Sequence, residues 1–502
     1  MGLTAAFVLG LISALALAPV SWPVCFLLGF AAFTVLLRHT HTLRLCFWRA
    51  FLYALGFHLA GLYWISASLF VDIHRYIWVL PFSLLALPAY LAIIFGLACC
   101  VAHFFRARPI IHVSVLASVV FISEFLRGIL FTGFPWNLPG YIWSETLPLA
   151  QGLSLIGIHG LTFLTLLAAA ALSLLFPKAG RAEMLLLATL GLIFSGLTLW
   201  GEQRLADHQT RYQHGVTLRL VQAAIQQSER KTTELRRKSL ERLKDLSAEP
   251  SQKRLSAVIW PETASPFILA ADDDARRYIA QIVPPRGALL TGTPGMLING
   301  ADKKYFNSLA VLDGNARIIG LYDKARLVPF GEFVPFRGIL KNVPIAADVI
   351  GSADFSPGPG PRTLRAPGLP PFSPLICYEA IYSHGVIDRR DPPAWLLQIT
   401  NDAWFGETSG PYQHFAMARM RAIEEGLPLV RSANTGISAV VDAYGRTLMS
   451  LDLGTRGILD APLPQPVDRA TLFSQIGFAP TLFLALIWLI LSLAAFFRLR
   501  KG

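Results

Sequence analysis

The chain is short of charged residues. Asp, Glu, Lys and Arg together make up 15% of its 502 residues, whereas hydrophobic residues make up 54%. A soluble globular protein carries a charge on about a quarter of its residues. The deficit therefore excludes a wholly soluble protein of this length, and the excess of apolar residues predicts several membrane spans.

Cysteine is also scarce, with five residues in the chain. Four of them, Cys25, Cys46, Cys99 and Cys100, lie in or beside long apolar runs, which leaves Cys377 alone in a water-soluble segment. A lone cysteine has no disulfide partner within its own domain, so Cys377 is either an inert packed residue or a reactive thiol. The soluble segment also lacks His-x-x-x-His and Cys-x-x-Cys patterns. We therefore predict neither a metal nor a cofactor.

What the sequence does contain is a series of apolar stretches. Seven lie in the first two hundred residues and an eighth closes the chain, at about 3–20, 22–37, 50–70, 76–103, 110–130, 147–176, 183–200 and 478–497. Pro19 and Pro23 break the first two, which are short enough to form a tight hairpin. We accordingly divide the chain into a membrane domain of seven helices over 1–200, a soluble domain over 201–475, and a terminal span with a basic tail over 476–502.

The basic residues between these stretches predict how the chain crosses the membrane. Lys and Arg gather in every second connection and after the last span, at Arg38, Arg44 and Arg49, Arg106 and Arg108, Lys178 and Arg181, and Arg498, Arg500 and Lys501. Such residues mark the cytoplasmic side. They also account for much of the net charge of +12 without a nucleic-acid partner. The soluble domain is then expected in the periplasm of a bacterial inner membrane, where a transfer reaction has no ATP and needs an esterified donor.

Two segments on the predicted outer side are richer in apolar residues than a solvated loop needs. The connection 127–141 is rich in aromatic residues, which fits either a belt at the lipid headgroups or the wall of a lipid-facing pocket. The segment 341–368 is rich in Pro, Gly and Ala, and we interpret it as a long loop that could act as a lid on the bilayer. Glu124 and Arg127, at the end of the fifth stretch, are expected to pair or to face a cavity.

The soluble domain alternates between strand and helix patterns. Apolar runs predict strands at 215–222, 255–260, 288–292, 307–312, 317–322, 394–400, 427–433 and 436–442, and helical spacing predicts helices at 226–248, 272–282 and 412–425. Asp313-Gly314-Asn315 between two of the strands is a strong hairpin signal. The sequence therefore predicts an α/β domain of sandwich type, joined to a multi-span α-helical membrane domain of about eight spans.

Three polar residues follow apolar strands in the soluble domain, namely Glu262, Lys324 and Cys377. Strand ends that converge can bring such residues into one site. A carboxylate can take the proton of a thiol, and an ammonium can stabilise both the thiolate and the oxyanion of a tetrahedral intermediate. The set is sufficient for acyl transfer through a thioester. Taken singly, each residue has a plainer interpretation. Glu262 fits an acid at a helix N-terminus, Lys324 fits a turn residue, and Cys377 fits a core residue.

The motifs around these residues resemble those of the carbon–nitrogen hydrolase, or nitrilase, superfamily. They are Trp-Pro-Glu262, Tyr-Asp-Lys324 followed by Leu-Val-Pro-Phe-Gly-Glu332, Ile-Cys377-Tyr378-Glu379, and Asn-Asp-Ala-Trp404-Phe. The resemblance implies a nitrilase-like α-β-β-α sandwich with a Glu262–Lys324–Cys377 triad. Because seven spans precede this domain and one follows it, the chain is similar to the membrane-embedded N-acyltransferases of that superfamily.

That resemblance implies a reaction in two steps. The sn-1 acyl chain of a membrane phospholipid, the donor, passes to Cys377 and a lysophospholipid leaves. The α-amino group of the S-diacylglyceryl cysteine of an apolipoprotein, the acceptor, then attacks the thioester. Glu262 would be the general base, and Lys324 would stabilise the oxyanion, with a backbone N–H near Tyr378. The implied supporting residues are Glu332, beside the lysine or the base, and, at the entrance, Tyr378, Glu379 and Trp404.

Two other functions remain open at this point. A membrane-anchored nitrilase-type amidase would use the same triad on an amide or ester, with water resolving the thioester. The triad does not distinguish water from an amine, but eight spans favour a lipid substrate because a plain anchor needs one. A transporter or lipoprotein-binding module with an inactive nitrilase fold is the second alternative, and the intact set of three residues disfavours it.

Overall fold

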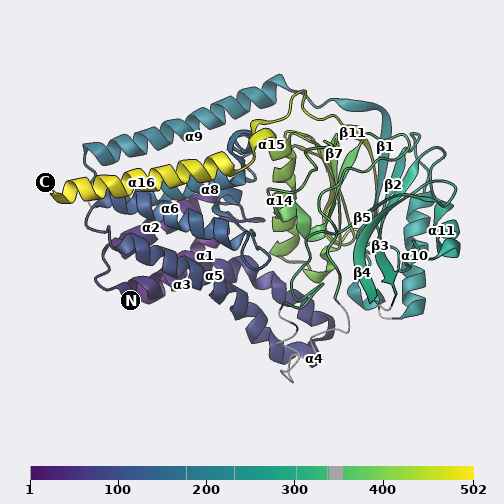
Figure 1. Cartoon of the computed structure of the whole chain (residues 1–502), viewed down its shortest axis with the longest axis horizontal. Helices are drawn as coiled ribbons and strands as arrows, with labels where there is room; N and C mark the ends of the chain where they lie inside the picture. Colours follow the sequence, from purple (N-terminus) through teal and green to yellow (C-terminus); the bar gives the residue numbers. More distant parts are fainter. Residues whose placement is uncertain are drawn as a thin grey trace. The chain divides into compact units, whose positions relative to one another are not determined.

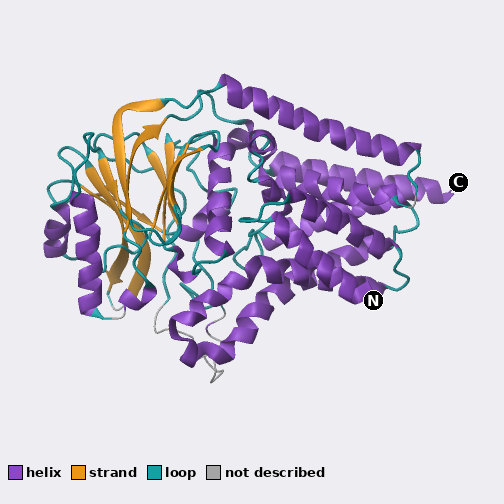
Figure 2. Cartoon of the chain, turned by 180° about the vertical axis from the view of Figure 1, so that it is seen from behind, coloured by secondary structure: helices purple, strands orange, loops and turns teal. Residues whose placement is uncertain are grey.

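The computed structural model describes residues 2–176, 178–230, 232–300, 302–335, 337 and 354–501. The chain divides into two compact units: Met1–Gln209, Phe405–Gly426 and Arg469–Gly502 form the first, and Thr210–Trp404 and Leu427–Asp468 form the second. Figures 1 and 2 show the two units in sequence colours and by secondary structure. Most of the predicted lid, residues 341–353, lies outside the described residues.

The first unit is helical. Its helices are α1 (Gly2–Ser13), α2 (Pro23–Arg38), α3 (Leu43–Leu62), α4 (Ile73–Tyr76), α5 (Leu80–His103), α6 (Pro109–Arg127), α7 (Leu147–Ala150), α8 (Leu153–Leu172), α9 (Arg181–Asp207), α14 (Ser409–Glu425), α15 (Leu472–Ile476) and α16 (Ala479–Lys501). Six helical stretches among the described residues are long and apolar enough to cross a membrane, and the shorter apolar helices Gly2–Ala16 and Pro23–Arg38 precede them. Their positions coincide with the eight apolar stretches of the sequence.

Helices α9 and α16 present apolar side chains outward. Leu192 on α9 is 74% exposed, and Phe483 and Ile490 on α16 are 64% and 62% exposed. Water would penalise such surfaces by about 25 cal/mol for each Å² of apolar area. A hydrocarbon environment removes that penalty, so the exposed faces of these helices favour a lipid setting.

The charged pair at the end of α6 is buried. Arg127 donates two hydrogen bonds to the Glu124 carboxylate, with donor–acceptor distances of 2.5 and 3.0 Å. It also donates to the backbone carbonyls of Phe134 (2.7 Å) and Trp136 (2.9 Å). A buried charge is tolerated when it is paired and fully hydrogen-bonded. The predicted pairing is thus confirmed, and it also fastens the aromatic-rich connection 127–141 to α6.

Helix α14 comes from the middle of the predicted soluble domain but groups with the first unit. The side-chain carbonyl of Gln413 accepts hydrogen bonds from the indole N–H groups of Trp64 (3.2 Å) and Trp136 (2.8 Å) and from the Asn137 amide (3.1 Å). All four side chains are buried. The helix therefore satisfies its polar groups within the first unit, and the stretch 201–475 is not one continuous unit in space.

A second tie between α14 and the helical unit lies at a break in α8. Gly157 has φ +63°, outside the helical region, so the helix is interrupted there and restarts at the next residue. The backbone N–H of Ile158 donates to the Glu424 carboxylate at 2.7 Å, and the Arg421 guanidinium lies 2.8 Å from the other oxygen of that carboxylate. An acid at a helix start satisfies an N–H that otherwise has no intrahelical partner.

The second unit contains two sheets. In the described residues one has six strands in the order β11-β1-β2-β3-β4-β5, and the other has five in the order β10-β9-β8-β7-β6. The strands are β1 (Tyr212–Gln222), β2 (Ala257–Ile259), β3 (Ala288–Asn299), β4 (Asp302–Leu312), β5 (Ile318–Asp323), β6 (Phe372–Ile376), β7 (Trp395–Thr400), β8 (Leu429–Ala433), β9 (Ser438–Val441), β10 (Thr447–Leu451) and β11 (Gly457–Pro464). Strands β1, β2 and β3 run parallel, as do β6, β7 and β8, and the predicted hairpin joins β4 to β5.

Alternation along the strands explains the layers. On β2, Ala257 and Ile259 pack into the core shared with the second sheet, whereas Val258 packs with Leu240 and Leu243 of helix α10 (Thr233–Ala248). Figure 1 shows α10 and α11 (Asp273–Ala280) covering the outer face of the sheet that holds β1 to β5. Strands buried on both faces are apolar throughout, which is why their sequence pattern is so clear. The predicted α/β sandwich is confirmed.

Candidate active site

Cys377 lies at a sharp turn. It follows β6 directly and begins the short helix η7 (Cys377–Ile381), with φ +51°. Residues other than glycine rarely adopt this left-handed region, and holding one there costs about 1–3 kcal/mol. The turn ends the strand abruptly and places the thiol at the carboxyl end of β6, where 8% of the residue remains exposed.

Glu262 and Lys324 come from the other sheet. Glu262 follows β2 and Lys324 follows β5, and the lysine side chain is 1% exposed. Its Nζ lies 3.5 Å from Glu262 Oε1 and 2.9 Å from Glu332 Oε1. Burial alone would lower the pKa of Lys324, but the charges of Glu332, Glu262 and Cys377 outweigh it, so the pKa lies above its ordinary value. The lysine is therefore a fixed positive charge at neutral pH.

The thiol of Cys377 rests in its neutral form. Burial raises the pKa of Cys377 above its ordinary value, the charge of Glu262 raises it further, and the charge of Lys324 lowers it by less. A thiol must lose its proton to become a strong nucleophile. Because the thiolate is not stable on its own here, proton removal has to accompany attack, and Glu262 is the carboxylate that acts most strongly on this sulfur.

Both oxygens of Glu262 are held by hydrogen bonds. Oε1 accepts from the side-chain amide of Asn307 at 2.8 Å, and Oε2 accepts from the backbone N–H of Asn401 at 2.8 Å. The same Asn307 amide donates to Glu332 Oε1 at 2.8 Å. Glu332 thus contacts Lys324 directly and is joined to Glu262 through Asn307. It can therefore support both the lysine and the base, the two roles that the resemblance implied for it.

Asn307 was not singled out by the sequence reasoning. It sits in β4 between the aromatic pair Tyr305-Phe306 and the apolar run from Leu309 onward. A polar side chain between aromatic and apolar residues of one strand is a signal that could have identified it, since buried polar groups need partners. Its partners, however, lie 45 and 25 residues away along the chain.

Glu379 lies in the interior. Only 4% of the residue is exposed. Its carboxylate accepts hydrogen bonds from the Tyr322 hydroxyl (2.7 Å) and from the backbone N–H groups of Ile376 (2.8 Å), Ala325 (2.8 Å) and Arg326 (3.3 Å). These donors come from the turn before Cys377 and from the segment around Lys324. The residue therefore clamps the nucleophile turn to the lysine segment, and its role at an entrance remains a prediction.

The two remaining predicted residues, Tyr378 and Trp404, differ in exposure. Tyr378 is buried, and its ring packs edge to face against Tyr382 with ring centroids 5.4 Å apart. Trp404 is 48% exposed at the end of the short helix η8 (Asp402–Trp404). Their roles at an entrance remain predictions.

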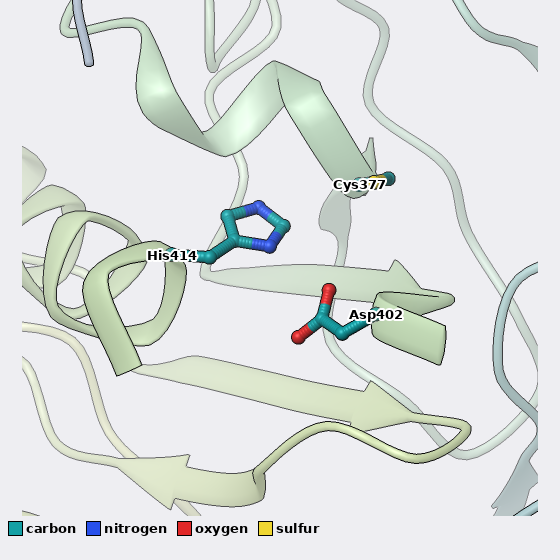
Figure 3. Close-up of side chains that lie close together, drawn as sticks. All are labelled: Cys377, Asp402 and His414. Carbon is teal, nitrogen blue, oxygen red and sulfur yellow. The ribbon is translucent and has the colours of Figure 1, made fainter. Parts of the chain in front are cut away.

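A network of buried polar side chains contacts the turn that carries Cys377. The Gln398 amide donates to the Cys377 carbonyl at 3.0 Å, and Arg431 donates to Gln398 Oε1 at 2.5 Å and to Asp402 Oδ2 at 2.6 Å. Figure 3 shows the Asp402 and Cys377 side chains at the starts of their short helices. Their carboxylate oxygen and sulfur lie within 4.8 Å of each other. Gln398 thus holds the backbone carbonyl of Cys377, and the fully buried Arg431–Asp402 ion pair holds Gln398 in place.

Replacing Glu379 with glutamine should destabilise the second unit. The change turns one acceptor oxygen into an NH₂ group that faces N–H donors, which costs about 2–4 kcal/mol. We expect the melting temperature of the purified protein in detergent to fall by roughly 5 °C or more. Glu241→Gln, which alters an exposed ion pair with Arg237 on α10, is the matched control and should leave it unchanged. Equal melting temperatures for the two variants would show that the clamp contributes little.

Comparison with known proteins agrees with this geometry. Residues 9–171 match the family model described as "Apolipoprotein N-acyltransferase N-terminal domain", and residues 217–471 match "Carbon-nitrogen hydrolase". The second match contains Glu262, Lys324 and Cys377.

Similar proteins include "Apolipoprotein N-acyltransferase" from Rhodopseudomonas palustris, 38% identical over 88% of this chain and 84% of the relative. The protein of that name from Bradyrhizobium diazoefficiens is 39% identical over the same shares. An amidase structure from Nesterenkonia sp. aligns with a TM-score of 0.37 and 20% identity, covering 51% of this chain and 94% of the amidase. The resemblance inferred from the motifs is confirmed by the family models and the curated relatives. The chain belongs to the apolipoprotein N-acyltransferase family.

Proposed function

We propose that this protein N-acylates apolipoproteins, using a phospholipid as the acyl donor and Cys377 as the carrier of the acyl chain. The observation that carries the proposal is the buried contact of Lys324 with the carboxylates of Glu262 and Glu332, in a domain where Cys377 shares its core with strands β2 and β5. Several helices of the same chain are long and apolar enough to cross a membrane, whereas a plain anchor needs only one span, and this supports a lipid donor.

The first step forms the thioester. Glu262 takes the proton of the Cys377 thiol as the sulfur attacks the sn-1 ester carbonyl of the phospholipid. Lys324 stabilises the resulting oxyanion, together with a backbone N–H near Tyr378. The C–O bond then breaks, and the proton on Glu262 passes to the departing oxygen, so that a lysophospholipid leaves. Cys377 now carries the acyl chain and Glu262 is again ionised.

The second step transfers the chain to an amine. The α-ammonium of the S-diacylglyceryl cysteine loses one proton to solvent and becomes a nucleophilic amine. Its nitrogen attacks the thioester carbonyl while Glu262 takes a second proton. The C–S bond breaks, and that proton returns to the Cys377 sulfur, which restores the thiol. No cofactor is needed, since the ester bond of the donor supplies the driving force.

The proposal also fixes the side of the membrane. The family and the apolar helices identify a bacterial membrane protein. The basic connections support an inner-membrane location with both termini in the cytoplasm and the catalytic residues in the periplasm. In that arrangement 1–200 and 476–502 form the membrane-embedded parts, and 201–475 carries the catalytic chemistry. A periplasmic site accounts for the use of an ester donor, because ATP is absent there.

A two-substrate product assay tests the reaction. The purified protein is incubated with a phospholipid and a diacylated lipopeptide, and the products are separated and identified by mass spectrometry. The proposal predicts N-acylated lipopeptide and lysophospholipid in equal amounts. Free fatty acid without N-acylated peptide would overturn it in favour of a hydrolase that uses the same three side chains.

A further inference from the structure

We propose that Asn307 is a positioning residue of this site, whose side-chain amide keeps Glu262 and Glu332 side by side in the form that accepts protons. The inference rests on the proposed function, because it gives Asn307 a role in that reaction. Asn307 would not touch the acyl chain or the amine. It would act through the base, by controlling the state and direction of the Glu262 carboxylate.

The contacts around Asn307 form a closed set. Its Nδ2 lies 2.8 Å from Glu262 Oε1 and 2.8 Å from Glu332 Oε1. An amide NH₂ group has two hydrogens, so each carboxylate receives one of them. Lys324 Nζ lies 3.5 and 2.9 Å from the same two oxygens. Two donors, one neutral and one positively charged, therefore hold the same pair of carboxylate oxygens.

The orientation of the amide follows from the chemistry of its partners. An ionised carboxylate only accepts hydrogen bonds, so the nitrogen of Asn307, and not its oxygen, must face the pair. The amide oxygen is buried and has no hydrogen-bond partner in the part of the chain that the structure describes. A buried acceptor without a partner costs about 1–3 kcal/mol. The orientation of the Asn307 side chain therefore satisfies both of its N–H donors and leaves its oxygen acceptor without a hydrogen bond.

Charge counting shows what those donors do. The site holds two carboxylates against one ammonium, and all three side chains are largely buried. Two close carboxylates with too few donors relieve their repulsion by sharing a proton. A Glu262 that carries a proton cannot accept one from the thiol. The other titratable groups that face this set are Cys377 and Glu379, which both interact with Lys324, and Asp402, which acts on Cys377.

The test measures how the acylation of Cys377 depends on pH. Wild-type protein and Asn307→Leu, which keeps the approximate size and removes both donors, are mixed with a phospholipid in detergent micelles. Intact-protein mass spectrometry then gives the rate of adduct formation between about pH 5 and 9. We expect the acidic limb to be displaced upward by about one pH unit, which lowers the rate by up to about 10-fold on that limb and leaves it near the wild-type rate at alkaline pH, because a shared proton must first be lost.

Two further variants make the result decisive. Asn307→Asp has the same shape, lacks the donors and adds a carboxylate, so its acidic limb should move further than that of Asn307→Leu. It carries the test alone if the leucine variant does not fold. Asn299→Leu, at the exposed end of β3, is the control and should keep the wild-type profile.

The possible failures can be told apart. Absence of a Cys377 adduct in the wild-type protein at every pH would defeat the proposed function itself. A wild-type adduct together with an unmoved acidic limb in the Asn307 variants would overturn the positioning role. A uniform fall at all pH values would do the same, since it is the signature of a purely structural residue.

Discussion

Cys377→Ala is expected to show no acyl adduct after incubation with phospholipid. The substitution removes the only atom that can form the thioester, and loss of a catalytic nucleophile costs at least about 10⁴-fold in rate. The two side chains differ by one sulfur atom, so the melting temperature should stay close to that of the wild-type protein. The measurement is intact-protein mass spectrometry, followed by peptide mapping to locate the added mass.

The control for this variant uses another of the free cysteines. Cys100→Ala removes a partly exposed thiol of α5 in the first unit, and this protein should acquire the adduct at the wild-type rate. An adduct of unchanged size on Cys377→Ala would place the acyl chain on a different residue and refute the assignment of the nucleophile.

The second large effect is expected for Glu262→Gln. Glutamine has the same shape but cannot take the thiol proton, and the thiol does not ionise readily because burial raises the pKa of Cys377. The new NH₂ group must also face the donor of either Asn307 or Asn401. We expect adduct formation to slow by about 10³-fold or more.

The change in pH dependence separates a base from a merely structural acid. The acidic limb of the wild-type rate profile should vanish in Glu262→Gln, because the group that must be ionised is gone. Glu229→Gln, which alters an ion pair with Arg242 elsewhere in the second unit, should retain both the rate and the limb. A Glu262→Gln protein that keeps the acidic limb would mean that another group accepts the proton.

The sandwich could be predicted from the sequence because its strands are buried on both faces. Such strands appear as short apolar runs, and the residue that follows each run lies at a sheet edge. That reasoning selected Glu262, Lys324 and Cys377, and the structure brings Glu262 and Lys324 into contact and lets both act on the thiol. The hairpin at Asp313-Gly314-Asn315 was equally clear, since turn chemistry is local.

The parts that could not be predicted depend on partners far away in the sequence. Periodicity indicated a helix over 412–425, but not that Gln413 would bind Trp64 and Trp136, which lie 349 and 277 residues away. The interior position of Glu379 likewise follows from donors 53 to 57 residues upstream. A sequence motif can identify such residues, but it does not reveal their hydrogen-bond partners.

The most direct test of the central claim is a pulse–chase on the wild-type protein with a phospholipid labelled isotopically in its sn-1 chain. The account predicts that the label first appears on Cys377 and then leaves it for the α-amino group of a diacylated lipopeptide, at matching rates. Label that reaches the peptide without passing through Cys377, or that leaves Cys377 only as free fatty acid, would contradict it.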